Sequence, residues 1–146
     1  MTVMTPEQIE AVEATMAVLA PALDDLAADV YARLDRLAPE TAELFTGDPA
    51  AQRQKFAAEL ETIVRAIRHH DAFLERASRL GRQHVHYGVR PVHYELVGAA
   101  LFEALAAALG ATWTEATAEA WRLAYRLTAE AMMQAGEAEG AASVSV

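Results

Sequence analysis

Three of the five histidines lie within ten residues of one another, at positions 84, 86 and 93. Imidazole nitrogens bind metal ions, so this spacing raises the question of a metal site. Successive side chains on a helix turn by about 100°, so His84 and His86 point away from each other and cannot share a target. The residues that precede His84 at helical spacing are apolar: Phe73, Ala77 and Leu80. The pattern therefore predicts one inward imidazole, His84, at the end of a buried helix face, with His86 near the polar side.

The absence of cysteine restricts which metal site His84 could belong to. Thiolate sites and disulfide bonds are both excluded. A metal held by protein alone would need more ligands, and no carboxylate cluster accompanies His84 in the sequence. Haem iron brings its own equatorial nitrogens and needs only one buried imidazole. Spacing alone leaves open the alternative that His84 is an ordinary core or capping residue.

The corner after His84 carries the residue types that end one helix and begin the next. Gly88 favours a helix stop because glycine readily adopts a left-handed conformation. Pro91 suits the first turn of a following helix, where its missing N–H would be unpaired in any residue. The sequence therefore predicts two helices joined by a tight corner, with His84 beside it.

The remaining sequence predicts helices only. Alanine, leucine and glutamate dominate, and no alternating run of Val, Ile and Thr suggests a strand. Thr5 and Gln8 form a capping box at the start of the first helix. His69 and His70 are predicted to end a helix, where cations are favoured. The predicted helices span about 6–20, 21–37, 50 to an end at 69–71, 73–84, 91–109 and 114–135, with a short turn at 39–45.

Length and charge limit the class of protein. The chain has 146 residues and a net charge of −9, which argues against nucleic acid or an anionic membrane as partner. No continuous apolar run reaches the roughly 18 residues that span a bilayer, and no signal peptide is visible at the start. The absence of cysteine fits a reducing compartment. We expect a soluble cytoplasmic protein with one domain over residues 1–146, ordered from about 5 to 135, and a C-terminal tail at 136–146 that frays.

A combination of short motifs resembles one known family. Around the corner stand Gln83-His84, Gly88-Val89-Arg90-Pro91 and His93-Tyr94-Glu95-Leu96-Val97-Gly98. Four further motifs lie at compatible spacing: Val30-Tyr31, Leu44-Phe45, Gln52-Arg53 and Ala120-Trp121 with Ala124-Tyr125. Together, over about residues 5 to 135, they resemble the bacterial globins related to the flavohaemoglobin haem domain.

The resemblance implies a globin fold of seven to eight helices around haem b (iron protoporphyrin IX). It implies reversible binding of O2, NO, CO or similar diatomic ligands, as in oxygen transport. Dioxygenation of nitric oxide and peroxidase-like chemistry are the enzyme activities that it leaves open. The chain has no room for a flavin or nicotinamide domain, so nitric oxide detoxification would need a separate reductase. A haem-based gas or redox sensor that acts through a partner protein is the alternative, and a haem-free helical interaction protein would need only the apolar stripes.

On the proximal side, the resemblance assigns iron to His84. It implies that Tyr94 and a carboxylate in the last helix hydrogen-bond around this histidine, which strengthens it as an electron donor. Tyr94 could instead be a helix-start residue that packs its ring. Counting from the last-helix tryptophan reaches Gly136, so Glu137 and Glu139 are both candidates for the carboxylate.

On the distal side, the resemblance assigns Tyr31 and Gln52 as polar groups that face a ligand on iron. Phe45 would contact the haem at the corner before the distal helix. Phe56 stands where the family usually has leucine, and its larger ring could narrow the pocket or displace Gln52. Lys55 could reach a haem propionate, although a solvated lysine is the plainer reading. Further side chains that would pack on the haem, or equally form ordinary core, are Leu80, Val89, Val97 and Leu101.

Overall fold

The computed structural model describes residues 3–85 and 88–144, and all regular structure in these ranges is helical. The all-α prediction is confirmed. The α-helices are α1 (Pro6–Leu19), α2 (Leu23–Leu37), α3 (Pro49–Ala66), α4 (His70–Val85), α5 (Pro91–Leu109) and α6 (Glu115–Val144). Three short 3₁₀ segments are η1 (Ala20–Ala22), η2 (Pro39–Leu44) and η3 (Gly110–Thr112). The described α-helices number six rather than seven or eight, because these three segments are too short to continue as α-helices.

Local capping explains where the first helix begins. The backbone N–H of Gln8 donates to Thr5 Oγ1 over 3.2 Å, and the backbone N–H of Thr5 donates to Gln8 Oε1 over 2.9 Å. Both halves of the predicted capping box are therefore present. Proline in the first turn also starts α3 and α5.

The prediction that His69 and His70 end a helix is wrong. The α3 helix stops at Ala66, and His70 is already the first residue of α4. The His69 carbonyl accepts the N–H of Phe73 over 2.8 Å, so His69 stands at the beginning of α4. Two adjacent histidines do not show whether a helix ends or begins at them. The residue that indicates a helix start is Asp71, an acidic side chain in the first turn of α4, where the helix dipole favours negative charge.

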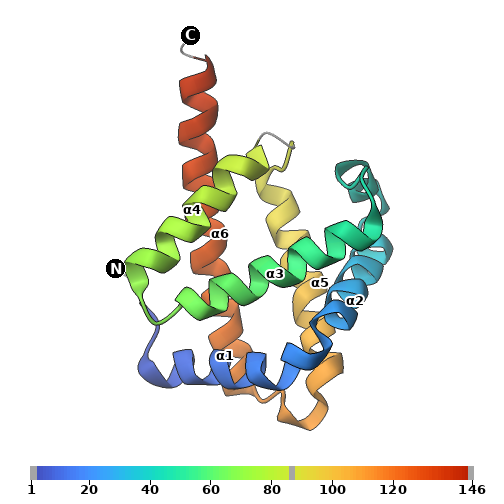
Figure 1. Cartoon of the computed structure of the whole chain (residues 1–146), viewed down its shortest axis with the longest axis vertical. Coiled ribbons are helices and arrows are strands. Elements are labelled where there is room, and N and C mark those ends of the chain that lie inside the picture. The colour runs from blue at the N-terminus through green and yellow to red at the C-terminus, as the bar shows by residue number, and fades with distance from the viewer. Residues whose placement is uncertain (1–2, 86–87, 145–146) are drawn as a thin grey trace.

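The last helix is longer than the sequence predicts. The α6 helix continues past Ala135 to Val144, and its final turns extend beyond the other helices (Figure 1). Glycines at 136 and 140 favoured an earlier end, since each costs about 1 kcal/mol relative to alanine. The alanines and glutamates between and after them are strong helix formers, and they compensate for both glycines.

The helices pack in two groups around one core (Figure 1). The α6 helix lies against α4 and α1, while α2 lies against α5 and α3. Ion pairs join elements distant in sequence: Arg68 with Glu13 at 2.6 Å, and Arg33 with Glu103 at 3.3 Å. Each is partly exposed, so solvent screens the attraction and its contribution to stability is small. Buried apolar side chains therefore supply most of the stability, and the largest fully buried ones are Phe73, Leu34, Leu101, Leu105, Val12 and Val30.

The α4 and α6 helices make a very close crossing at a glycine. A Cβ atom built on Gly81 would lie 2.5 Å from the Met132 Cα and would overlap the Met132 carbonyl oxygen. Gly136 faces the same crossing, and its Cβ would lie 3.4 Å from the Gly81 carbonyl oxygen. Because Gly81 is one turn before His84, this crossing holds the end of α4 in place.

One helix is long and apolar enough to cross a membrane by length and composition. This stretch is Pro91–Thr112, which includes α5 and η3. The search for a continuous apolar run did not identify this stretch, because Glu95 and Glu103 interrupt it. The inner side of α5, including Ala100, Leu101 and Leu105, is buried in the core. These features are those of a core helix in a globular fold.

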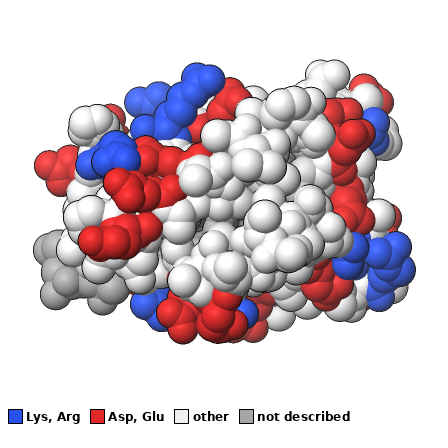
Figure 2. Space-filling view, turned by 90° about the horizontal axis from the view of Figure 1, so that it is seen from below, with Lys and Arg blue, Asp and Glu red and all other residues white. Residues whose placement is uncertain are grey.

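The surface agrees with the acidic composition. Viewed from below in Figure 2, acidic side chains surround a broad uncharged area, and the basic side chains form small groups between them. On this face no wide basic patch is visible, as a net charge of −9 leads one to expect. Nucleic acids bind to clustered positive charge, which this face does not offer.

Candidate functional site

The His84 side chain lies in the last turn of α4 and is half-buried. Its Nδ1 is 2.7 Å from the Leu80 carbonyl oxygen. A carbonyl oxygen can only accept, so the neutral ring carries its proton on Nδ1 and keeps the lone pair of Nε2 free. This is the tautomer that a metal-binding imidazole requires, and a hydrogen bond to a backbone carbonyl is a common means of fixing it.

From Gly88 onward, the corner after His84 has the predicted structure. Gly88 has φ +80°, a left-handed conformation that suits glycine. The Val89 N–H donates to the His84 carbonyl over 3.3 Å. His93 Nδ1 accepts the Arg90 N–H over 2.8 Å, so His93 caps the start of α5. The prediction that His86 lies near the polar side falls on a residue outside the described ranges.

Three aromatic rings from three elements meet on the predicted distal side. The Tyr31 ring on α2 lies 5.2 Å from the Phe45 ring and 5.9 Å from the Phe56 ring, both edge-on. Phe45 follows η2, and Phe56 belongs to α3. Edge-to-face pairs at these distances are favourable by about 0.5–1.5 kcal/mol each. The larger ring of Phe56 therefore packs on Tyr31, and the two side chains fix each other.

The Tyr31 hydroxyl points toward α3. It donates to the backbone carbonyl of Gln52 over 3.5 Å, which is a long and weak hydrogen bond. Burial raises the pKa of Tyr31, so the phenol stays protonated at neutral pH and remains a donor. The Gln52 side chain extends toward the preceding loop, with Nε2 3.5 Å from the Cβ position of Gly47. Gln52 is thus beside Tyr31 through its backbone rather than through its amide.

The other predicted haem-packing residues divide by burial. Leu80 and Leu101 are buried, and Val89 and Val97 are half-buried. Phe45, Phe56, Tyr94 and Val97 all pack against the same apolar cluster that contains Leu80 and Leu101. Lys55 is exposed on α3 and makes no ion pair within the described part of the chain. The two predicted sides of the site therefore border one continuous apolar cluster.

The predicted proximal partners of His84 are Tyr94 and a carboxylate of the last helix. In the last helix, the position reached by counting is Gly136, which faces Gly81 and Val85 of α4 and carries no side chain. Glu137 is exposed and Glu139 is half-buried. The Tyr94 ring is half-buried, and burial raises the pKa of its phenol. The hydrogen bond that His84 makes in this structure goes to the neutral Leu80 carbonyl.

The sequence did not predict that Tyr125, on α6, contacts the start of α5. The Tyr125 hydroxyl donates to the backbone carbonyl of Tyr94 over 2.5 Å. Its ring lies against Gly98, where a Cβ atom would come within 2.8 Å of Tyr125 Cε2. A glycine in the middle of a long apolar helix was the available signal, since it often marks a close approach. Tyr125 thus ties α6 to the helix that follows the His84 corner.

The donor set fits haem better than a metal ion held by protein alone. Within the described residues, no group of three or more His, Cys, Asp or Glu could hold a metal ion. Haem needs one axial protein ligand and an apolar surrounding. His84 offers a free Nε2 and the cluster around Leu80 offers the apolar surface. The residues present therefore fit haem.

The buried phenols predict an alkaline loss of stability. Burial raises the pKa of Tyr31, Tyr94 and Tyr125 in the folded state, and for Tyr125 the neighbouring Tyr94 phenol adds to the effect. Above pH about 10 the unfolded chain releases these protons and the folded chain keeps them. The free energy of unfolding should therefore be level from pH 8 to about 9.5 and fall above pH 10.

Urea unfolding between pH 8 and 11 measures this slope. Tyr125→Phe should make the fall above pH 10 shallower, because one of the three phenols is gone. The same variant also loses its hydrogen bond to Tyr94, but that loss is the same at pH 8 and serves as the internal control. Equal slopes for Tyr125→Phe and the parent chain would contradict the assignment.

Comparison with known proteins places the chain in a family. A sequence model of the family described as Globin matches residues 28–132. The flavohemoprotein of Bordetella pertussis is 30% identical over 145 residues, which is 97% of this chain and 36% of that protein. The flavohemoprotein of Halalkalibacterium halodurans is 29% identical over 134 residues, 90% of this chain and 33% of that protein. This chain thus spans about a third of the length of these two relatives.

A third relative is matched over most of its length. A globin-like protein of Aquifex aeolicus is 28% identical over 130 residues, which cover 89% of this chain and 92% of that protein. The family match covers both sides of the site described above, from before Tyr31 to beyond Tyr125. The chain therefore belongs to the globin family.

Proposed function

We propose that this globin binds haem b through His84 Nε2 and holds dioxygen and related diatomic gases, NO and CO among them, reversibly. The observation that carries the proposal is the 2.7 Å contact between His84 Nδ1 and the Leu80 carbonyl, which leaves Nε2 free to bind iron. Bound haem supplies the coordination position at which such a gas is held. Membership of the globin family supports the same reading.

On the distal side, Tyr31 is the proposed donor to the gas. Its buried phenol is protonated and hydrogen-bonded only weakly, over 3.5 Å, so it can turn to a better acceptor at small cost. Phe45 and Phe56 hold the half-buried ring from two sides. Gln52 is the second proposed polar group: its backbone stands next to the Tyr31 hydroxyl, and its amide, which extends toward the preceding loop in this structure, would turn toward the same gas. Lys55 is proposed to face a haem propionate from the exposed side of α3.

Dioxygenation of nitric oxide is the reaction that we propose, with electrons from a separate reductase. The names of the flavohemoprotein relatives support a flavin-linked partner for such a cycle. The proximal side supports gas binding over peroxidase-like chemistry. A neutral carbonyl on His84 Nδ1 makes the imidazole a weaker donor than a carboxylate partner would. The chain contains no cysteine, which fits a reducing compartment, and we therefore propose a cytoplasmic protein.

Haem titration and gas equilibration test the binding proposal. The purified chain should take up haemin at a ratio of about one to one and show a Soret band, as one axial site predicts. The reduced protein should then change its visible spectrum on exposure to dioxygen and return on its removal. A chain that never acquires a Soret band would refute the haem proposal. A spectrum that does not respond to dioxygen would refute the gas-binding part alone.

Nitrate counting tests the proposed reaction. Supplied with dioxygen, nitric oxide and a flavin-dependent reductase, the holoprotein should form many nitrates per haem. Formation of a single nitrate per haem, without further turnover, would support a carrier and rule against a dioxygenase. The same assay without reductase gives the single-turnover baseline.

Tyr31→Phe is predicted to accelerate dioxygen loss by about 10- to 100-fold, since a hydrogen bond to a charged acceptor is worth about 1.5–3 kcal/mol. The phenyl ring retains the contacts with Phe45 and Phe56, so haem uptake should not change. Carbon monoxide carries much less negative charge, so its dissociation rate should change little. Flow mixing with each gas measures both rates. An unchanged dioxygen rate would show that Tyr31 is not the donor.

A further inference from the structure

Two charged side chains join the helix of the proposed distal groups to the helix of the proposed iron ligand. Glu59 lies on α3, which also carries Phe56, and Arg76 lies on α4, which also carries His84. Arg76 Nη2 donates to both carboxylate oxygens of Glu59, over 2.5 Å to Oε1 and 2.7 Å to Oε2. Hydrogen bonds between two charged groups are shorter and stronger than those between neutral groups. This ion pair therefore links the two sides of the proposed gas-binding site.

Burial distinguishes this pair from an ordinary surface ion pair. The side chains of Arg76 and Glu59 are 30% and 29% exposed, whereas those of the Arg65–Glu61 pair within α3 are 76% and 36% exposed. Arg76 Nε is buried and has no hydrogen-bond partner among the described residues. The Arg76 guanidinium therefore enters the space between the helices instead of lying on the surface. Solvent and salt screen such a pair less than an exposed one, so it can hold its two helices at a fixed distance.

On α3, the pair lies one turn from the aromatic cluster. Glu59 follows Phe56 by three residues, and side chains at this spacing are neighbours on a helix. The Phe56 ring packs edge-on against the Tyr31 ring, with 5.9 Å between the ring centroids. The Tyr31 hydroxyl itself makes only a 3.5 Å hydrogen bond to the α3 backbone. A displacement of α3 at Glu59 would therefore move the contacts that orient the Tyr31 phenol.

On α4, the pair lies one turn from the contact that orients His84. Arg76 precedes Leu80 by four residues, so the two side chains are neighbours on the helix. The Leu80 carbonyl oxygen is 2.7 Å from His84 Nδ1. The ion pair is therefore close, along each helix, to a residue that orients a proposed functional side chain.

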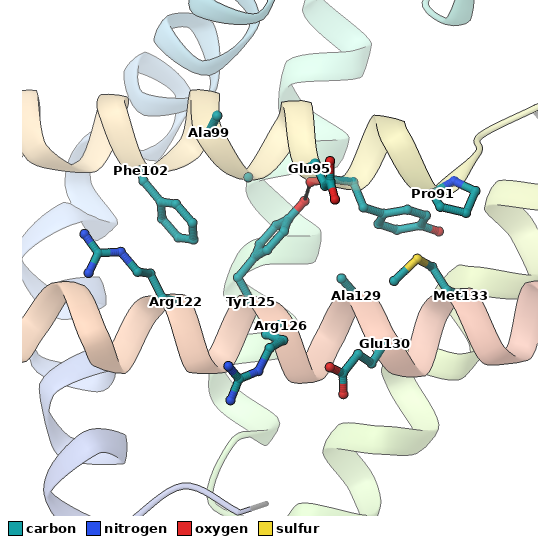
Figure 3. Close-up of a pocket in the computed structure, with 12 residues that line it drawn as sticks. Pro91, Glu95, Ala99, Phe102, Arg122, Tyr125, Arg126, Ala129, Glu130 and Met133 are labelled. Atoms are coloured by element: carbon teal, nitrogen blue, oxygen red, sulfur yellow. Dashed lines mark hydrogen bonds between the residues drawn. The ribbon is translucent and has the colours of Figure 1, made fainter.

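The helices on the proximal side are held to one another by contacts that do not involve α3. The α4 and α6 helices meet at the Gly81 crossing. The Tyr125 side chain spans the space between α6 and α5 (Figure 3), and its hydroxyl donates to the Tyr94 carbonyl. The α3 helix packs mainly against α2, α4 and α1. The Glu59–Arg76 pair is thus a specific link between the distal helix and these three proximal helices.

We propose that Glu59 and Arg76 are positioning residues. Their ion pair sets the separation of α3 and α4 and, through Phe56, the direction in which Tyr31 presents its hydroxyl to a bound gas. The role toward Tyr31 rests on the proposed gas binding, whereas the role in helix separation concerns the chain alone. Removal of one partner leaves an unpaired charge in a half-buried position, which is unfavourable. That charge gains solvent when the helices move apart, so the separation of α3 and α4 should increase.

Pulsed electron paramagnetic resonance with two spin labels measures the helix separation. The chain contains no cysteine, so the exposed changes Gln54→Cys on α3 and Arg79→Cys on α4 provide specific labelling sites. The labelled parent chain should give a narrow distance distribution. In this labelled chain, Glu59→Gln and Arg76→Met should each broaden the distribution and shift it to longer distances. The exchange variant Glu59→Arg/Arg76→Glu should restore the narrow distribution, because the pair is reversed rather than lost.

Glu61→Gln is the matched control for the helix separation. It is the same chemical change two positions away on α3, and it breaks the more exposed pair with Arg65 instead. Its distance distribution should remain that of the labelled parent chain. A distribution that neither Glu59→Gln nor Arg76→Met alters would refute the positioning role. An exchange variant as broad as the single variants, or a Glu61→Gln variant as broad as Glu59→Gln, would refute it as well.

Dioxygen dissociation from the haem-loaded protein tests the role toward Tyr31. Arg76→Met should accelerate dioxygen loss by about 3- to 10-fold, a part of the roughly 10- to 100-fold acceleration predicted for Tyr31→Phe. In the Tyr31→Phe background, Arg76→Met should cause no further acceleration, because the hydroxyl through which it acts is gone. Carbon monoxide dissociation should change little in either background. An equal acceleration with and without the Tyr31 hydroxyl would show a general loosening of the pocket and would refute the action through Tyr31.

The two measurements separate the ion pair from the proposed gas binding. If the chain takes up no haem, the gas-binding proposal and the role toward Tyr31 are both refuted, and the label distances still decide whether the pair sets the helix separation. If haem and dioxygen bind but the label distances do not change, the pair has no positioning role and the proposed function stands. Far-UV circular dichroism of each variant confirms that the helices are retained.

Discussion

His84→Gly is expected to eliminate stable haem binding while leaving the helical fold in place. The change removes the one described imidazole that sits on the apolar face of α4 with its Nε2 free. Loss of an outer hydrogen-bond partner lowers metal affinity by about 10- to 100-fold, and loss of the ligand itself should exceed that range. Glycine in the last turn costs about 1 kcal/mol of helix stability, which the buried core can sustain.

Haem titration followed by the Soret band measures this effect, and added imidazole sharpens it. Free imidazole should enter the space left by His84→Gly and restore a low-affinity haem complex. His69→Ala is the matched control, because His69 is exposed at the start of α4 and acts through its backbone carbonyl. His86→Ala is also predicted to retain haem. Loss of haem in His86→Ala with retention in His84→Gly would refute the choice of ligand.

Local signals predicted most helix boundaries. The capping box at Thr5 and the prolines at positions 6 and 91 act within one turn of the helices they start, so their effect can be read without tertiary structure. The stripe that ends at His84 follows from helical period alone. Gly88 behaves as a helix stop because its left-handed φ needs no distant partner.

Contacts between helices far apart in sequence could not be predicted in the same way. Nothing local shows that Gly81 lies on Met132, fifty-one positions later, or that the Tyr125 hydroxyl reaches the Tyr94 carbonyl. The end of α6 was misjudged because two glycines were weighed as local stops, while Gly136 serves a crossing with α4. The sequence also placed His70 at the end of one helix rather than at the start of the next. A histidine near a helix boundary does not show which of the two helices it belongs to.

The distal cluster lies between these two cases. Each of Tyr31, Phe45 and Phe56 could be singled out in the sequence, but only by resemblance, since each is also an ordinary core aromatic. The structure brings the Phe45 and Phe56 rings, from separate elements, to 5.2 and 5.9 Å from the Tyr31 ring. It also shows that Gln52 contacts Tyr31 through its backbone, which no residue pattern encodes.

Gly81→Ala is expected to cause the largest loss of stability of any single-methyl change described. The new Cβ would overlap the Met132 carbonyl and lie 2.5 Å from its Cα, so relief requires α4 and α6 to move apart. Backbone atoms cannot rotate away as a flexible side chain can, and overpacking typically costs about 1–3 kcal/mol. Alanine also has a helix propensity about 1 kcal/mol more favourable than that of glycine. The measured loss of unfolding free energy is therefore the cost of the overlap minus this gain. His84 lies one helical turn after Gly81, so separating the two helices would also displace His84. Haem affinity should therefore fall together with stability.

Gly136→Ala is the matched control at the same crossing. Its Cβ would meet the Gly81 carbonyl at 3.4 Å and Val85 Cβ at 3.6 Å, which are near ordinary contact distances. The gain in helix propensity, about 1 kcal/mol, should then make this variant as stable as the parent or more stable. Thermal unfolding of both variants decides the matter, since 1 kcal/mol shifts the Tm by about 2–4 °C in a chain of this size. A fall in Tm for Gly136→Ala as large as that for Gly81→Ala would mean that any methyl at this crossing is excluded. An unchanged Tm for Gly81→Ala would mean that α4 and α6 can separate freely, and that their crossing does not hold His84.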